Sequence, residues 1–120
     1  MLSTDEIIKK RYASVDAKNI EEFINLLSDD HRLVFAHRAP VIGKENAREQ
    51  VLEFWSMIKS VRHEITHIHD CGDTQLIEAL VHYEMPDGSK HEIPCCDVME
   101  IRSGKILEQR AYLDQSSLFA

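Results

Sequence analysis

The stretch TQLIEALVHYEMPDGSKHEIPCCDVMEI, residues 74–101, contains two runs in which apolar and polar residues alternate. Alternation with a period of two is typical of a strand that buries one face. The segment Pro86-Asp87-Gly88-Ser89 between the two runs consists of turn-forming residues. Together these features predict an antiparallel hairpin with strands at Thr74–Met85 and Lys90–Ile101.

The same period continues on both sides of this hairpin, at Val61–His69 and Lys105–Leu113, whereas the first half of the chain has helical periodicity. We expect a first helix that begins after Ser3, with Glu6 at capping-box spacing, and a second helix that is capped by Asn19 and ends at Ser28-Asp29-Asp30. A short strand at Arg32–Ala36, a loop at His37–Gly43 and a third helix at Lys44–Lys59 are expected to follow. Helices followed by a meander of strands predict the α+β fold class, with the helices packed on one face of an antiparallel sheet.

The composition narrows the class of protein further. A chain of 120 residues with 43% apolar residues is enough for one globular domain. The net charge is −7 and the basic residues are scattered, so we do not expect nucleic acid as a partner. The longest apolar runs are only a few residues, too short to span a bilayer, so we expect no membrane partner. The acidic start of the chain does not resemble a secretory signal, and three cysteines do not form a disulfide framework, so we expect a cytoplasmic protein.

One carboxyl group is predicted on the buried face of the sheet. Strand alternation places Asp97 on the same side as Cys95 and Met99, where it is the only acid. We expect it opposite Ala79 on one neighbouring strand and opposite Ala111 on the other. Desolvation would favour its neutral form, which can donate a hydrogen bond to a developing oxyanion or act as a general acid. The alternative is that Asp97 only satisfies a buried His or Tyr in the core.

The expected strand pairing extends along both neighbours of the Asp97 strand. Tyr83 is expected opposite Ile93 and Met99 opposite Gln109.

Six short motifs along the chain resemble those of the SnoaL-like, nuclear transport factor two-like superfamily, which includes ketosteroid isomerases, polyketide cyclases, scytalone dehydratases and limonene epoxide hydrolases. These motifs are Arg11-Tyr12-Ala13-Ser14-Val15-Asp16-Ala17-Lys18-Asn19, Asp29-Asp30, Gly43-Lys44-Glu45-Asn46-Ala47, Asp97-Val98-Met99, Gly104-Lys105-Ile106 and Arg110-Ala111-Tyr112-Leu113-Asp114.

The resemblance implies one domain over residues 1–120 and a cone-shaped fold, in which a curved antiparallel sheet wraps around N-terminal helices and encloses an apolar cavity. It also implies a homodimer. Asp97 falls where ketosteroid isomerases have their oxyanion-hole aspartic acid. Arg11 stands at the place of their helix-one tyrosine, and no carboxylate lies near Phe35–His37 for their general base. The residues that match the epoxide hydrolase catalytic set are apolar, at Ala79, Val81 and Ala111.

His63 matches a position where such families often have an inward-facing histidine. The resemblance therefore implies a catalytic set of His63 and Asp97, with Tyr83 as a third group, and no metal or cofactor. The expected ligand is a small hydrophobic molecule with a carbonyl or hydroxyl group, and the expected chemistry is that of an isomerase, dehydratase or cyclase. A binding or interaction module without turnover is the alternative. The expected pocket-lining residues are Tyr12, Phe35, Trp55, Ala79, Val81, Cys95, Met99, Gln109 and Ala111.

A competing motif overlaps this site. His63-Glu64-Ile65-Thr66-His67 matches the H-E-x-x-H signature of zinc proteases, which requires a helix so that both histidines reach one metal ion. The β-branched residues and the Cys71-Gly72-Asp73 turn favour a strand instead, on which the two histidines would be about 13 Å apart. Zinc hydrolysis is therefore the remote alternative.

Overall fold

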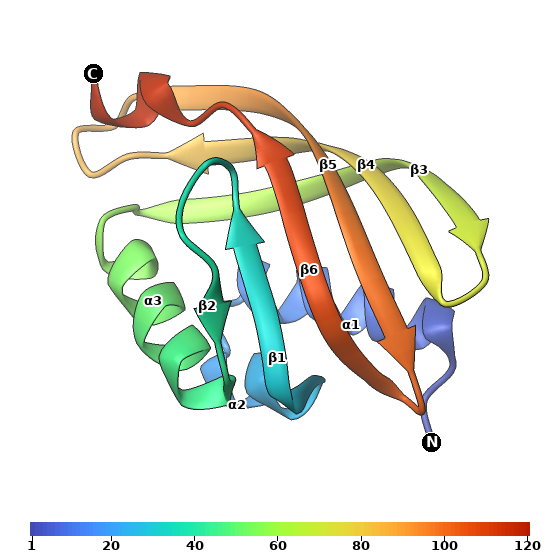
Figure 1. The fold of residues 1–120 in the computed structure, drawn as a ribbon. Coiled ribbons are helices and arrows are strands. Elements are labelled where there is room, and N and C mark those ends of the chain that lie inside the picture. Colours follow the sequence, from blue (N-terminus) through green and yellow to red (C-terminus); the bar gives the residue numbers. More distant parts are fainter.

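A computed structural model describes all 120 residues. The chain forms three α-helices, six strands and a C-terminal 3-10 helix (Figure 1). The elements in chain order are α1 (Thr4–Asp16), α2 (Ile20–Asn25), β1 (Leu27–Phe35), β2 (Val41–Ile42), α3 (Lys44–Ser56), β3 (Ser60–Cys71), β4 (Thr74–Glu84), β5 (Lys90–Arg102), β6 (Lys105–Leu113) and η1 (Ser116–Phe119). The predicted caps are present: Ser3 and Glu6 form a capping box, and Asn19 accepts a hydrogen bond from the Glu22 backbone.

The six strands form one sheet in the order β2-β1-β6-β5-β4-β3. Neighbouring strands are antiparallel except β1 and β6, which are parallel. Figure 1 shows the sheet curving, with α1 crossing one side of it and α3 lying beside β1 and β2. This architecture confirms the predicted α+β fold with a curved sheet around the N-terminal helices.

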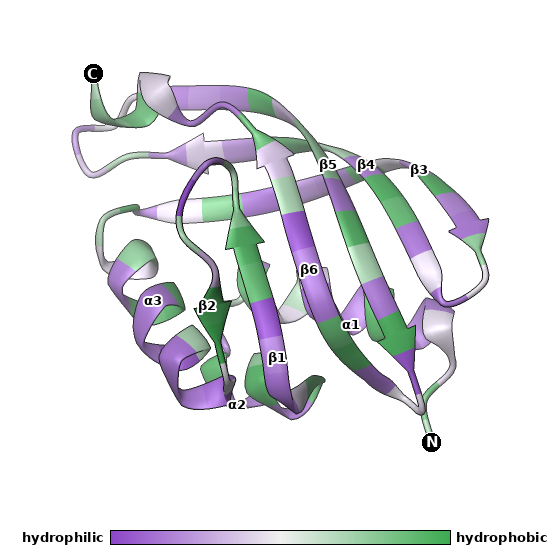
Figure 2. Cartoon of the chain, in the orientation of Figure 1, coloured by the Kyte–Doolittle hydropathy of each residue, from purple (hydrophilic) through white to green (hydrophobic).

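Apolar and polar residues alternate along β4 and β5, and this alternation gives each strand one buried side. Every odd-numbered residue from Gln75 to Tyr83 in β4, and from Ile93 to Ile101 in β5, is buried. Figure 2 shows the corresponding change between hydrophilic and hydrophobic colour along these strands. Because successive side chains point to opposite sides of a sheet, this pattern directs one side of β4 and β5 toward the helices.

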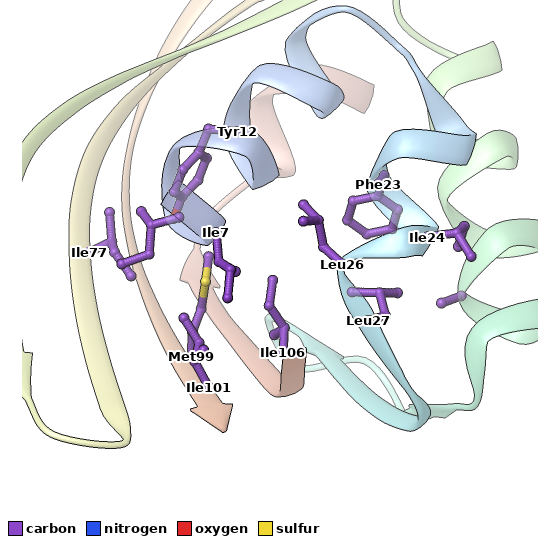
Figure 3. Close-up of a cluster of buried hydrophobic side chains, with 12 residues drawn as sticks. Ile7, Tyr12, Phe23, Ile24, Leu26, Leu27, Ile77, Met99, Ile101 and Ile106 are labelled. Carbon is purple, nitrogen blue, oxygen red and sulfur yellow. The ribbon is translucent and has the colours of Figure 1, made fainter. Parts of the chain in front are cut away.

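A core of twelve buried residues joins α1 and α2 to the sheet. In Figure 3, Ile7 and Tyr12 of α1 lie close to Met99 of β5 and Ile77 of β4. A second buried cluster contains Trp55 of α3 and residues from β3, β4 and β5. The first cluster therefore occupies the part of the inner side of the sheet that α1 and α2 cover, and the second cluster lies at the end that faces α3.

Several predicted boundaries were wrong in the first half of the chain. β1 begins at Leu27 rather than Arg32, so Ser28-Asp29-Asp30 belongs to a strand and does not form a turn. The reason is tertiary: Leu27 pairs with Ile106 of β6, and this pairing overrides the local turn preference of the Ser-Asp-Asp segment. The predicted loop contains β2, and α3 ends at Ser56 rather than Lys59.

The predicted register holds on one side of β5 and fails on the other. Asp97 pairs with Ala111 of β6, as expected. On β4, however, Asp97 pairs with Ile77, while Ala79 pairs with Cys95. The hairpin closes by a hydrogen bond from the Met85 backbone N–H to the Ser89 carbonyl, at 2.9 Å. This bond centres the turn on Asp87 rather than on Gly88, so every pair moves by two residues and Tyr83 lies opposite His91 instead of Ile93.

The turn between β5 and β6 offers a test of local stability. Arg102 pairs with Lys105, and both central residues have positive φ, +51° for Ser103 and +75° for Gly104. Two-residue hairpin turns of this type favour Asn-Gly, because asparagine tolerates the left-handed region better than most residues. We expect Ser103→Asn to stabilise the protein by about 0.5 kcal/mol in urea unfolding. Ser103→Val is the matched control and should destabilise it; equal stability of the two variants would contradict this account.

Candidate functional site

A pocket opens at the end of the sheet that faces α3. Its wall is built from α1, α2, α3, the segment between β1 and β2, and the inner sides of β1, β3, β4, β5 and β6. Of its 19 lining residues, 13 are hydrophobic. The space between them, open mouth included, is about 740 Å³. A mainly apolar wall with a few polar groups is typical of sites for small molecules.

The structure places six of the nine expected lining residues on this wall and three elsewhere. The six on the wall are Phe35, Trp55, Val81, Cys95, Gln109 and Ala111. Tyr12 and Met99 lie in the core cluster where α1 packs on the sheet, and Met99 is fully buried there. Ala79 is buried beside Cys95 but does not line the pocket.

Asp97 lies on the pocket wall with only 2% of its surface exposed. Tyr12 Oη donates a hydrogen bond to Asp97 Oδ2 at 2.6 Å, and Cys95 Sγ donates to Oδ1 at 3.3 Å. Burial and the neighbouring Asp97 raise the pKa of Tyr12, so its phenol keeps the proton that it donates. Burial likewise raises the pKa of the Cys95 thiol, which argues against a nucleophilic thiolate at this position.

His63 enters the pocket from β3 and is held by a residue that the sequence analysis did not single out. His63 Nδ1 lies 2.7 Å from Asp16 Oδ1, and the His63 backbone N–H donates to Asp16 Oδ2 at 3.0 Å. Because the carboxylate accepts, the ring proton is assigned to Nδ1, which leaves the Nε2 lone pair free. The imidazole also lies against the Tyr12 ring, with 4.9 Å between ring centroids.

Tyr83 is the third predicted site residue, and it also lines the pocket. Its hydroxyl accepts a hydrogen bond from Gln115 Nε2 at 2.9 Å, and its ring meets Phe54 edge to face. Burial raises the pKa of Tyr83, so the hydroxyl stays protonated. The predicted residues His63, Asp97 and Tyr83 are therefore all among the residues that line the pocket.

A model of the SnoaL-like domain family matches residues 8–109. The chain belongs to the SnoaL-like family. None of the curated proteins matches it significantly. The earlier motif resemblance therefore agrees with a family match over most of the chain.

Solved structures share the fold of this SnoaL-like chain. A ketosteroid isomerase-like protein from Catenulispora acidiphila, in complex with trimethylamine, is 24% identical, with 97% of this chain and 91% of that chain covered and a TM-score of 0.87. A putative polyketide cyclase from Pseudomonas putida is 19% identical, with 97% and 95% covered and a TM-score of 0.80. An epoxide hydrolase-like protein from M. tuberculosis is 16% identical, with 94% and 84% covered and a TM-score of 0.80. At these identities the likeness establishes the fold alone.

The H-E-x-x-H segment of this SnoaL-like chain lies on strand β3, so the helix that the zinc signature requires is not formed. The side chain of His63 is bonded to Asp16, whereas His67 is exposed and 3.8 Å from Glu78. An irregularity in the register between Ile65 and His67 also places His67 on the opposite side of the sheet from His63. No group of three or more His, Cys, Asp or Glu side chains could hold a metal ion, and no helix is long and apolar enough to cross a membrane.

The sequence did not predict the roles of two polar residues of the site, Asp16 and Arg11. Asp16 follows Tyr12 by four residues on α1, and this spacing, which puts both on one side of the helix, was an available signal. Arg11 was noted only as the counterpart of a tyrosine. It lines the pocket, is 8% exposed, and donates from Nε to Gln109 Oε1 at 2.9 Å.

Proposed function

We propose that this SnoaL-like protein catalyses proton transfer on a small, largely apolar compound that carries a carbonyl or hydroxyl group. The chemistry would be that of an isomerase, dehydratase or cyclase, with His63 as general base. The observation that carries the proposal is that His63, which lines an apolar pocket, is paired with Asp16 through Nδ1, while its Nε2 makes no hydrogen bond. A histidine held in this tautomer can accept a proton at neutral pH.

The proposed step begins with a C–H bond next to the carbonyl of the ligand. His63 Nε2 takes the proton, and the electron pair of that bond moves into the enolate while charge develops on the carbonyl oxygen. In its neutral form Asp97, which also lines the pocket, would stabilise that oxygen or supply a proton to it. Return of the proton to another atom of the ligand completes an isomerisation, and loss of a hydroxide leaving group as water completes a dehydration.

A binding module without turnover is the second candidate, and the two hydrogen bonds to Asp97 favour it. Both Asp97 oxygens already accept hydrogen bonds within the protein, from Tyr12 and Cys95. A carboxyl group satisfied in this way could simply stabilise the pocket wall. The relative from Catenulispora acidiphila, whose structure contains trimethylamine, supports small-molecule binding by this fold without indicating a reaction. Homodimer formation and a cytoplasmic location stay predictions.

Hydrogen exchange distinguishes the two candidates. We expect the wild-type protein to accelerate exchange of deuterium from solvent into carbon positions next to the carbonyl of small apolar ketones, measured by proton NMR. His67→Asn is the matched control, because His67 is exposed on the same strand and should not matter. Saturable binding of these ketones with exchange only at the buffer rate would overturn the catalytic proposal and favour the binding module.

A further inference from the structure

Arg11 is a buried cation that forms no salt bridge, although Asp97 and Asp16 lie near enough to raise its pKa against the larger effect of burial. Only 8% of its surface is exposed, and no carboxylate oxygen of the protein forms a salt bridge with it. Its one hydrogen bond goes from Nε to the uncharged amide oxygen of Gln109. Buried arginines are normally paired, because removing a charge from water is costly. Burial accordingly lowers the pKa of Arg11, although an arginine stays protonated in proteins.

The two terminal nitrogens of Arg11 are available to a ligand. Neither Nη1 nor Nη2 makes a hydrogen bond to the protein. They are not sealed inside it, since Ser28 Oγ is the only fully enclosed side-chain N or O atom without a partner. The guanidinium carbon lies 4.5 Å from the centroid of the Phe23 ring, and this stacking helps to fix the plane of the group. Arg11 is also one of the residues that line the pocket.

The charges around the pocket favour an anionic guest. Arg11 and Arg38 are the lining cations, and Asp97 is the only lining carboxyl group. Arg38 is exposed and lies near the Phe35 ring, which places it at the mouth. The oxygens of Asp97 are occupied by Tyr12 and Cys95. This pocket is thus more basic than the rest of a chain whose net charge is −7.

We propose that the ligand carries a carboxylate on an apolar body, and that Arg11 binds this carboxylate through Nη1 and Nη2. The planar fork of a guanidinium matches the two oxygens of a carboxylate, and such paired hydrogen bonds are strong in a site with little water. The inference concerns the pocket proposed above and rests on that pocket being the ligand site. Combined with proton transfer at His63, it makes the substrate class an apolar oxo acid or hydroxy acid.

The single tryptophan of the chain provides the measurement. Trp55 lines the pocket, so its fluorescence reports occupancy. Benzoate, benzamide and benzylamine share a phenyl body and differ in charge. We expect the wild type to bind benzoate at least about tenfold more tightly than benzamide. Arg11→Met should abolish this preference, Arg11→Lys should keep part of it, and Arg102→Met, at an exposed arginine, should leave it unchanged.

Three outcomes would overturn the inference: no saturable effect of benzoate, equal affinity for benzoate and benzamide, or tighter binding of benzylamine. The wild-type comparison decides the matter even if Arg11→Met does not fold. His63→Asn should retain the preference for benzoate, because His63 is not part of the anion site. A protein that prefers benzoate but catalyses no exchange would therefore contradict the proposed function and leave this inference standing.

Discussion

Replacing His63 with asparagine is expected to lower the rate of proton transfer by about 10²–10⁴-fold, the usual contribution of a positioned general base. Asparagine retains an N–H that can bond to Asp16 Oδ1, so the wall should keep its shape. What it lacks is the basic Nε2 lone pair. The measurement is the initial rate of solvent deuterium exchange into a carbonyl compound that the wild type labels, with ligand affinity followed by Trp55 fluorescence.

This loss should appear in the rate rather than in binding. The body of the ligand contacts the apolar wall, which His63→Asn does not change, so we expect the affinity to stay within a few-fold of wild type. His67→Asn, on the same strand but exposed, should exchange at the wild-type rate. A folded His63→Asn protein with an undiminished rate would exclude His63 as the base.

Asp16 is expected to act through His63 as a positioning residue. Asp16→Asn puts an amide where a carboxylate accepts the Nδ1 proton, which favours the tautomer with the proton on Nε2 and thereby blocks the base. If this is its role, Asp16→Asn should lower the rate in the wild-type background and have almost no further effect in the His63→Asn background. A merely structural role would instead produce losses that multiply, and that result would contradict the assignment.

The sequence predicted the site where the information was local. Alternation assigned Asp97 to the buried side, and the rule that opposed residues share a side of the sheet predicted its pairing with Ala111 correctly. The two-residue Ser103-Gly104 turn alone would put Asp97 opposite Arg110, and an irregularity in the register between Glu100 and Ile101 restores the pairing of buried residues. The Pro86–Ser89 segment can close a hairpin in more than one way, and the β4–β5 register was therefore wrong by two residues. Periodicity determines which side a residue faces but not which residue lies opposite.

The contacts that give the site its chemistry are not local. Asp16 and His63 are 47 residues apart, and Tyr12 and Asp97 are 85 apart. No helical or strand period relates such positions, because the packing of α1 across the sheet brings them together. The same cause explains the missed start of β1, where pairing with β6 extends the strand through residues that prefer turns locally.

A second large effect is expected on acid stability, through His31 of β1. This side chain is 1% exposed, and its Nδ1–H donates to the Ile106 carbonyl at 3.0 Å. Burial, with a smaller effect from Arg11 in the same direction, lowers the pKa of His31 from 6.5 to about 4, against the opposing effects of the Ile106 hydrogen bond and of Glu108 and Asp30. A histidine buried in its neutral form must gain a proton when the protein unfolds in acid.

The sign of the effect follows from which state binds the proton. Between pH 6.5 and about 4 the unfolded chain protonates His31 and the folded chain does not. The folding stability that neutral His31 contributes is therefore complete above pH 6.5, and it is lost as the pH falls from 6.5 toward about 4. The difference in pKa corresponds to about 3 kcal/mol of unfolding free energy.

Urea unfolding across this pH range tests the prediction with His31→Gln. Glutamine can donate to the Ile106 carbonyl but does not titrate, so the free energy of unfolding of the variant should fall by about 3 kcal/mol less than that of the wild type on acidification. At neutral pH the His31→Gln variant should be less stable than the wild type, because glutamine does not fill the space of the imidazole. As the pH is lowered, the difference in free energy of unfolding between the two proteins should shrink. His37→Gln, at an exposed histidine that makes no side-chain hydrogen bond, should follow the wild-type curve closely. A constant stability difference between His31→Gln and wild type at every pH would show that His31 takes up its proton equally well in the folded and unfolded states.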